Sequence, residues 1–566
     1  MRMIRICLVL AGLGLVGGLL LSLCLAAGNL ASAQGRWSEP VMLSTNTVSS
    51  WFPAIILDYQ GRVHVFYSSS FPPEKEERER VSIDLLMHTM WDGERWLEPS
   101  DILNPGDGGY VTRPRVVLDR AGNFHLLCRH PLLIHYTWSP VETAHRPQSW
   151  APLRLLSGYD GAYYSDIAID SHGTLHVVWN EVTQDARGEE SWICSDCADI
   201  YYRRSTDGGR TWSAPANISR SPGGSTKCQI VVDAHDIIHV IWEEGVDLTG
   251  RGQSQGIASR RSTDGGMTWE PVYHVINGTL FTAGSTPQAI PTGQPTLTPT
   301  PTPLPTHRQW FSPTVFLNEP GVPLQVDLAV NSIGGATLMV WRTVPGDHLY
   351  YQVSQDAGAT WSQPAIIPGI WSRPANETGW DIYDMATDSI GYIHLVAVGR
   401  LQARPSTGAG TPILASDGLY HLTWNGNAWS APEQIYREGG SFPEWPQIAV
   451  SMGNQLHVVW FIRGIEDQFR SEEGKYTVWY ASRSVEVPAI TPLPLFTPTP
   501  TATATATPLP LPTNTPFPTL PPGSSGLPDS AALYSETDDL LRLLVALSPV
   551  FLLIGLIFVL RKIRRY

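Results

Sequence analysis

One phrase recurs along this chain and restricts the folds available to it. Each copy has an apolar stretch, a polar turn rich in Asp, Asn, Ser or Gly, and a second stretch rich in β-branched and aromatic residues, a pattern typical of a β-hairpin. Seven copies occur, starting at Leu57, Leu118, Ile169, Val232, Val330, Thr387 and Val450. A hairpin repeated at this spacing indicates an architecture built from identical units.

Two further strands follow most copies of the hairpin. The third ends in a pair of aromatic residues, and the fourth begins with Trp followed closely by Pro. These tryptophans are Trp96, Trp150, Trp212, Trp269, Trp310, Trp361 and Trp429. Four strands every 50 to 60 residues predict an all-β fold, a β-propeller of seven four-stranded blades, with six blades as the alternative. Trp269 and Trp310 both begin a possible fourth strand for the same hairpin. We therefore expect an extra or displaced strand within residues 270–310.

The last hairpin has no fourth strand after it. The segment RWSEPVMLS, which starts at Arg36, has the pattern of the missing strand. We therefore expect the N-terminal strand to complete the last blade and close the ring, because closure removes the sheet edges that would otherwise pair with other chains.

The two ends of the chain predict secretion and membrane attachment. Residues 1–33 read as a signal peptide ending at Ala31-Ser32-Ala33, and residues 540–560 are apolar and long enough to cross a bilayer as a helix. A basic tail, 561–566, follows this segment and predicts a cytoplasmic C-terminus. A buried helix of a globular domain is the alternative, and the Pro/Thr-rich tract before the segment disfavours it.

Composition sets the remaining domain boundaries. We expect the propeller over residues 34–487, a Pro/Thr-rich insertion within it at 286–306, and a Pro/Thr-rich stalk at 488–530. The predicted location is the cell membrane, single-pass, with the N-terminal bulk outside the cell. A formal net charge of -14 argues against nucleic acid as a partner.

Four cysteines remain after the signal peptide, an even number in an oxidising compartment. They are Cys128, Cys194, Cys197 and Cys228, and we treat them as disulfide candidates with free thiols as the alternative. A four-thiolate zinc site prefers two C-x-x-C pairs, and the chain has one. No metal or cofactor is therefore expected.

A second phrase, S-x-D-x-G-x-T-W, occurs three times after third strands. Its copies are Ser205, Asp207, Gly209, Thr211, Trp212; Ser262, Asp264, Gly266, Thr268, Trp269; and Ser354, Asp356, Gly358, Thr360, Trp361. In a tight turn the carboxylate accepts backbone N–H bonds, the Gly supplies a positive φ, and the Trp covers apolar surface between sheets. A repeated element suits a structural fastener better than a catalyst, and one carboxylate per copy is too few for a calcium loop.

This phrase resembles the Asp-box of the sialidase (neuraminidase) superfamily, also called the BNR repeat, and the resemblance covers roughly residues 36–487. It implies a propeller whose active site lies on the rim opposite the boxes. In that family three arginines hold the substrate carboxylate, a Tyr activated by a Glu is the nucleophile, and an Asp is the acid/base. The residues that could take these roles are Arg115, Arg129, Arg342, Arg400, Tyr383, Glu243 and Asp166.

The expected rim residues come from the starts of first strands and the ends of second strands. Besides the candidates above, they include Arg113, Tyr163, Tyr164, Gln229, Asp327, Trp380, Asp381, Asp384, Glu444, Trp445, His130, Glu181, Glu244 and Arg463. A histidine begins most second strands, and we expect it to pack and hydrogen-bond between blades. These histidines are His64, His125, His176, His239, His394 and His457.

The family's Phe/Tyr-Arg-Ile-Pro motif is absent, and the nearest phrase, Thr112-Arg113-Pro114-Arg115, differs in order. We therefore expect a surface-displayed, membrane-anchored, sialidase-like propeller that binds glycan or protein ligands through the rim opposite the boxes. The alternatives are an exo-α-sialidase-type glycoside hydrolase and a structural envelope protein, and a fold does not decide among them.

Overall fold

The computed structural model describes residues 35–45, 47–71, 83–104, 110–158, 161–182, 198–221, 224–246, 256–277, 310–311, 314–315, 322–331, 336–344, 348–372, 383–401, 417–439, 441–464 and 476–490. The predicted signal peptide, insertion, membrane segment and basic tail lie outside these ranges, as does the stalk beyond residue 490. The chain divides into two units, Met1–Pro498 and Thr499–Tyr566, and the second contains no described residue. In the described part of the chain, no helix has the length and apolar character needed to cross a membrane.

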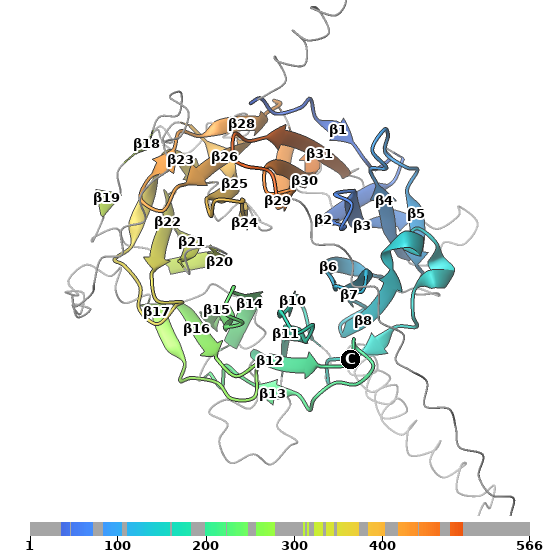
Figure 1. Ribbon diagram of the computed structural model, residues 1–566, viewed down its shortest axis with the longest axis horizontal. Coiled ribbons are helices and arrows are strands. Elements are labelled where there is room, and N and C mark those ends of the chain that lie inside the picture. The colour runs from blue at the N-terminus through green and yellow to red at the C-terminus, as the bar shows by residue number, and fades with distance from the viewer. Residues whose placement is uncertain are drawn as a thin grey trace, which may run out of the picture. The chain divides into compact units, whose positions relative to one another are not determined.

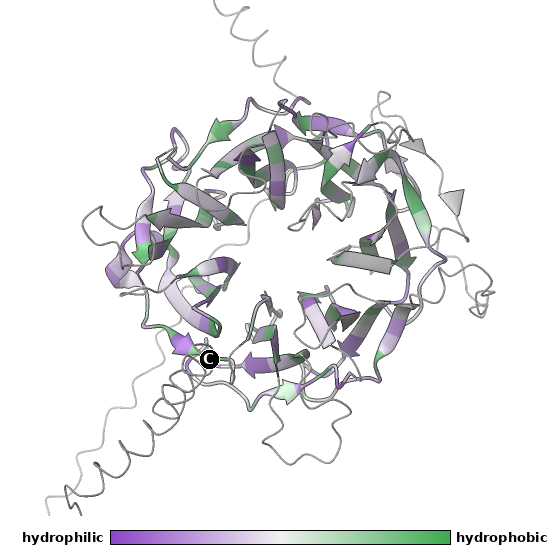
Figure 2. Cartoon of the chain, turned by 180° about the vertical axis from the view of Figure 1, so that it is seen from behind, coloured by the Kyte–Doolittle hydropathy of each residue, from purple (hydrophilic) through white to green (hydrophobic). Residues whose placement is uncertain are grey.

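The described residues form antiparallel sheets arranged in a ring around a central axis, as in a β-propeller (Figure 1). Within them the only helical segments are two short 3-10 turns, η1 (Val141–Thr143) and η2 (Pro147–Ser149). The all-β prediction is confirmed. Hydrophilic and hydrophobic residues are interspersed along the strands of the ring (Figure 2), as expected for strands packed against neighbouring sheets.

Five sheets have four strands each. They are β2 (Ser49–Leu57), β3 (Val63–Phe71), β4 (Ile83–Met90) and β5 (Ser100–Leu103); β6 (Thr112–Leu118), β7 (Asn123–Arg129), β8 (Ile134–Pro140) and β9 (Arg154–Leu155); β10 (Ser165–Ile169), β11 (Leu175–Val182), β12 (Ala198–Ser205) and β13 (Ala216–Asn217); β14 (Gly224–Val232), β15 (Ile238–Val246), β16 (Gly256–Ser262) and β17 (Tyr273–Asn277); and β29 (Ser441–Ser451), β30 (Gln455–Gly464), β31 (Thr477–Ser484) and β1 (Val41–Met42). In each, the repeated hairpin forms the first two strands.

The sixth sheet has eleven strands and contains two such units. One comprises β20 (Val322–Val330), β21 (Thr337–Val344), β22 (His348–Ser354) and β23 (Ala365–Ser372), with β19 (Thr314–Val315) on β23; the other comprises β24 (Tyr383–Thr387), β25 (Ile393–Arg400), β26 (Gly418–Trp424), β27 (Trp429–Ser430) and β28 (Glu433–Tyr436). Two residue pairs join them, Trp371 with Arg400 and Ser372 with Gly399. The displaced strand expected near Trp310 is β18 (Trp310–Phe311), which pairs with β27, whereas the strand after Trp269 is β17.

The first and last described strands share one sheet. Val41 and Met42 of β1 pair with Tyr480 and Trp479 of β31. The Leu43 N–H also donates to the Val478 carbonyl at 2.8 Å. The predicted closure of the ring by the N-terminal strand is confirmed.

The turn inside five of the seven hairpins is organised by one carboxylate. In the first copy, Asp58 Oδ1 accepts hydrogen bonds from the Gln60 and Arg62 N–H groups, both at 2.8 Å. Its other oxygen lies 3.4 Å from Nε2 of His64, which begins the second strand. Gly61 has φ +78°, a conformation that few other residues adopt. The turn therefore fixes the orientation of the histidine six residues after its Asp.

The same arrangement recurs around the ring. The Asp and His partners are Asp58 and His64, Asp119 and His125, Asp170 and His176, Asp233 and His239, and Asp388 and His394, while Ser451 replaces the Asp beside His457. In five of the six, the other ring nitrogen bonds a third-strand residue: His88, Tyr136, Tyr202, His421 or Tyr480. These histidines therefore form hydrogen bonds as predicted, but the partners belong to the same sheet and not, as expected, to a neighbouring blade.

Each S-x-D-x-G-x-T-W turn, called a box turn from here on, is closed by its own Asp. Asp207 Oδ1 accepts hydrogen bonds from the Ser205 hydroxyl at 2.8 Å and the Thr211 N–H at 2.9 Å, and Oδ2 accepts the Thr211 hydroxyl at 2.6 Å. The turns at Asp264 and Asp356 repeat these bonds. These are the hydrogen bonds expected of a carboxylate that closes a tight turn.

Box turns also join neighbouring sheets. The Tyr136 hydroxyl of β8 donates to the Gly208 carbonyl of the next box turn at 3.2 Å, and the Trp212 ring packs edge-on against Tyr136. Arg204 Nη1 donates to the Gly265 carbonyl of the following turn at 2.9 Å. Arg261 Nη1 likewise donates to the Ala357 carbonyl of the third turn at 2.6 Å. In the arginine pairs before Ser205 and Ser262, the second arginine therefore binds the main chain of the next box turn.

Candidate functional site

The seven first strands line the axis of the ring (Figure 1). They are β2, β6, β10, β14, β20, β24 and β29. Box turns follow third strands, and third strands run parallel to first strands in an antiparallel sheet, so first strands begin at the rim opposite the box turns. The rim named by the sequence resemblance is therefore where these strands start.

Several first strands carry a bulge near their start. Phe52, Arg113, Lys227 and Trp445 have φ between +48° and +56°, an uncommon conformation for residues other than glycine. The pairing register shifts at each of them. Bulges change the direction of the following side chains, and here the residue two positions later faces the axis.

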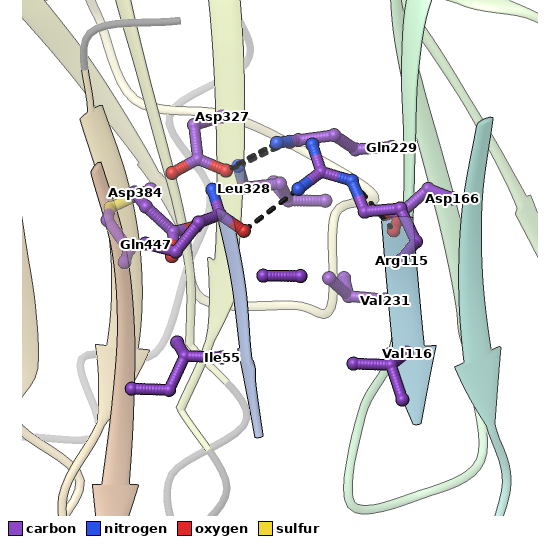
Figure 3. Close-up of a pocket in the computed structure, with 12 residues that line it drawn as sticks. Ile55, Arg115, Val116, Asp166, Gln229, Val231, Asp327, Leu328, Asp384 and Gln447 are labelled. Carbon is purple, nitrogen blue, oxygen red and sulfur yellow. Dashed lines mark hydrogen bonds and ion pairs between the residues drawn. The ribbon is translucent and has the colours of Figure 1, made fainter. Parts of the chain in front are cut away.

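Those axial side chains enclose a pocket with a cavity of about 180 Å³ (Figure 3). Twelve residues line it, and every first strand contributes at least one of them. An axial set with one residue per strand consists of Ala54, Arg115, Asp166, Gln229, Asp327, Asp384 and Gln447. Six of these seven residues are polar. Apolar residues, including Ile55, Val116 and Val231, line the remainder of the wall.

Arg115 spans part of this axial pocket. Its Nη1 donates to Gln447 Oε1 at 2.8 Å, and its Nε lies 3.8 Å from Asp166 Oδ1. Gln447 belongs to β29, two sheets from β6 (Figure 3). The intervening sheet contributes Ala54 and Ile55 to the lining, and the small side chain of Ala54 leaves room for this contact.

The three pocket carboxylates connect neighbouring sheets. Asp166 accepts the Ile230 N–H at 2.9 Å, and Asp384 accepts the Ile448 N–H at 2.7 Å. Asp327 accepts the Gln229 side-chain amide at 2.8 Å. These carboxylates therefore belong to the framework of the ring as well as to the pocket surface.

Burial is the largest influence on the pKa values of two of these carboxylates. Burial raises the pKa of Asp166, and the Arg115 charge opposes that rise. Burial also raises the pKa of Asp384 to about 7, despite the Ile448 N–H bond and Arg115. Asp384 therefore ionises at a higher pH than an exposed carboxyl does.

A second guanidinium, that of Arg113, lies within a cluster of aromatic rings. Its Cζ is 4.5 Å from the ring centroid of Phe52, 4.3 Å from Tyr163, 4.7 Å from Tyr164 and 5.3 Å from Trp445. Cation–π contacts of this kind stabilise a desolvated cation. This arginine–aromatic cluster joins four sheets, because its members come from β2, β6, β29 and the segment before β10.

Arg129 shares one ring with that cluster. Its Cζ lies 4.4 Å from the Tyr163 centroid, and its Nε donates to the Ala162 carbonyl at 2.9 Å. Two other rim cations form ion pairs: Lys227 with Glu243 at 3.0 Å and Arg463 with Glu444 at 2.5 Å.

The structure brings two of the predicted catalytic residues into contact, Arg115 and Asp166. Arg129 contacts Tyr163, Arg400 donates to the Ser372 carbonyl at 3.1 Å, and Glu243 pairs with Lys227. Arg342 is buried on β21, and Tyr383 lies in an apolar cluster with Ala397 and Ile370. Trp380 and Asp381 lie outside the described residues.

The five apolar wall residues were not predicted, and neither were two residues of the axial set, Ala54 and Gln447. Both follow an X-Pro pair at the start of a first strand, as does Arg115: Phe52-Pro53-Ala54, Trp445-Pro446-Gln447 and Arg113-Pro114-Arg115. The residue before proline is disfavoured in the right-handed helical conformation, and here it takes the left-handed one. This shared pair is the sequence signal that identifies them.

The cysteine prediction needs a correction. Cys128 and Cys228 are free, buried thiols, so neither forms a disulfide. Each lies in a different apolar cluster, and burial raises the pKa of the Cys128 thiol to about 12. Cys194 and Cys197 lie outside the described residues. Among described residues, no group of three His, Cys, Asp or Glu side chains could hold a metal ion.

No protein-family profile matches the chain, and no curated protein matches its sequence. Solved structures do resemble it. A Dyadobacter fermentans protein of unknown function has a TM-score of 0.41 and 14% identity, over 80% of this chain and 99% of its own. The NanB sialidase of Streptococcus pneumoniae has a TM-score of 0.38 and 13% identity, over 80% of this chain and 70% of its own. An intramolecular trans-sialidase of Ruminococcus gnavus has a TM-score of 0.37 and 11% identity, over 80% of this chain and 96% of its own.

Proposed function

We propose that this chain is a membrane-anchored, cell-surface propeller that binds a glycan in its axial pocket, near the rim opposite the box turns. One observation carries the proposal: all seven first strands contribute to the lining of one cavity, and six of its twelve lining residues are polar. Carboxylates, amides and a guanidinium offer both acceptors and donors to sugar hydroxyls. A glycan suits such a surface better than an apolar ligand does.

We further infer seven blades. The eleven-stranded sheet contains two complete hairpin units joined by two residue pairs, which suits two adjacent blades. The predicted signal peptide, stalk and membrane segment supply the anchoring and display that the proposal requires.

The contacts around the candidate catalytic residues support binding over hydrolysis. Arg129 and Arg400 bond main-chain carbonyls, and Tyr383 lies in an apolar cluster rather than on the pocket wall. A sialidase mechanism needs its arginines and its nucleophile to meet at one substrate.

The test measures glycan binding by the full-length chain in detergent micelles on a glycan array, with a fluorogenic sialoside assay on the same preparation. Gln447→Leu removes a pocket amide and should weaken binding about tenfold, because one lost hydrogen bond costs roughly 1–2 kcal/mol. Gln434→Leu, at an exposed position on β28, is the matched control and should bind normally.

Two results would reject the proposal. Absence of binding to every glycan would remove its basis. Sialoside turnover that disappears in Tyr383→Phe would instead support the exo-α-sialidase alternative.

A further inference from the structure

The axial pocket carries more negative than positive groups. Its described lining has one guanidinium, Arg115, and three carboxylates, Asp166, Asp327 and Asp384. The remaining polar residues are neutral amides. When all four charged groups are ionised, the wall therefore carries an excess of two negative charges.

The single cation in that lining is already engaged. Arg115 donates to Gln447 across the pocket and lies beside Asp166 of the adjacent sheet (Figure 3). A ligand carboxylate would have to replace these contacts and would approach Asp327 and Asp384 as a like charge. Like-charge contacts in a desolvated site are strongly unfavourable.

We infer that the pocket selects a sugar bearing a protonated amine and rejects a sugar carboxylate. This inference rests on the proposed function and specifies its ligand class. The cavity of about 180 Å³ is below the roughly 300–1,000 Å³ of sites for larger ligands, so one terminal sugar residue enters.

The ionisation of Asp384 gives the selection a pH dependence. Because burial raises its pKa to about 7, this carboxyl gains its charge as the pH rises through neutrality. The other charged groups lining the pocket are Arg115, Asp166 and Asp327. Amine binding should therefore strengthen as the pH rises from about 6 to 7, where the sugar amine still carries its proton, whereas binding of a neutral sugar should stay constant over that range.

The test compares three matched oligosaccharides by calorimetry on the full-length chain in detergent. They end in glucosamine, N-acetylglucosamine or N-acetylneuraminic acid. We expect the amine to bind about tenfold more tightly than the N-acetyl form at about pH 7, and the sialylated form to bind at least about tenfold more weakly than the N-acetyl form.

Asp384→Asn tests the source of the selection. The Asn side-chain oxygen can still accept the Ile448 N–H, so the framework bond is kept while a charge is removed. The preference for the amine should fall to about threefold or less. Asp101→Asn removes the same charge from an exposed position on β5 and should leave the preference unchanged.

Equal or tighter binding of the sialylated sugar would overturn the inference while leaving glycan binding intact. An amine preference that Asp384→Asn does not reduce would overturn it as well. Absence of binding to all three sugars would count against the proposed function, and the inference would fall with it.

Discussion

The Tyr136 hydroxyl occupies the space that a side chain at Gly209 would need. A Cβ built on Gly209 would lie 1.9 Å from that oxygen, and Gly266 stands in the same relation to Tyr202, at 1.8 Å. The second glycine of these two box turns is therefore required by the neighbouring sheet as well as by its own φ of +83° or +77°.

Gly209→Ala should consequently destabilise the fold by about 2–4 kcal/mol, through backbone strain and a steric clash. Gly208→Ala is the control, because Gly208 has φ +70° but no atom within 4 Å of a built Cβ. It should cost only about 1 kcal/mol. Chemical unfolding of the two variants measures the difference, and equal losses would show that the tyrosine contact contributes nothing.

Asp207→Asn should lower the melting temperature of the protein at pH 7 and reduce the loss of its stability at acidic pH. Hydrogen bonds from Thr211, first from its side chain and then from its N–H, lower the pKa of Asp207 to about 2. A carboxyl with a lowered folded-state pKa stabilises the fold above its unfolded pKa, near 4, and loses that effect as the pH falls towards 2. The melting temperatures of variant and wild type should converge over this interval.

His457→Gln should flatten the dependence of stability on pH between about 6.5 and 4. Burial lowers the pKa of His457 to about 4, so the unfolded chain takes up a proton in this range before the folded chain does. Stability therefore falls as the pH falls, by up to about 3 kcal/mol for this one group. His172→Gln, at an exposed position, is the control, and an unchanged slope in His457→Gln would contradict the assignment.

Leu43→Pro should open the ring. The Leu43 N–H donates to the Val478 carbonyl, and proline removes that donor, at a cost of about 3 kcal/mol or more. Leu43→Ala keeps the hydrogen bond and loses only buried side-chain contacts, so it serves as the comparison. Hydrogen exchange at β31 should rise in the proline variant, and unaltered protection there would show that β1 is dispensable.

Much of the fold follows from local sequence, because each hairpin has its own turn signal. The Asp or Ser residue, the turn and the histidine lie within seven residues, as in Asp58 to His64, so the strand pair is visible in one window. The pairing of β1 with β31 could also be predicted, since no fourth strand follows the last hairpin in the sequence.

The pocket could be predicted only in part. Which side chain faces the axis depends on the bulges at Phe52, Arg113 and Trp445, which interrupt the alternation expected of a regular strand. The contact between Arg115 and Gln447 joins residues 332 positions apart, so no local pattern predicts it. The disulfide prediction was wrong for Cys128 and Cys228 because an even count does not show that these two residues occupy separate cores.

Because β1 and β31 share a sheet, β1 cannot pair until the ribosome has synthesised β31. Ser44 and Val478 are hydrogen-bonded across 434 positions, so the earliest strand leaves the ribosome long before its partner exists. At roughly 5–20 residues per second, that interval is about 20 to 90 seconds. During it the nascent chain carries an unpaired strand that chaperones or the translocation machinery must shield, and any truncated product keeps that strand exposed.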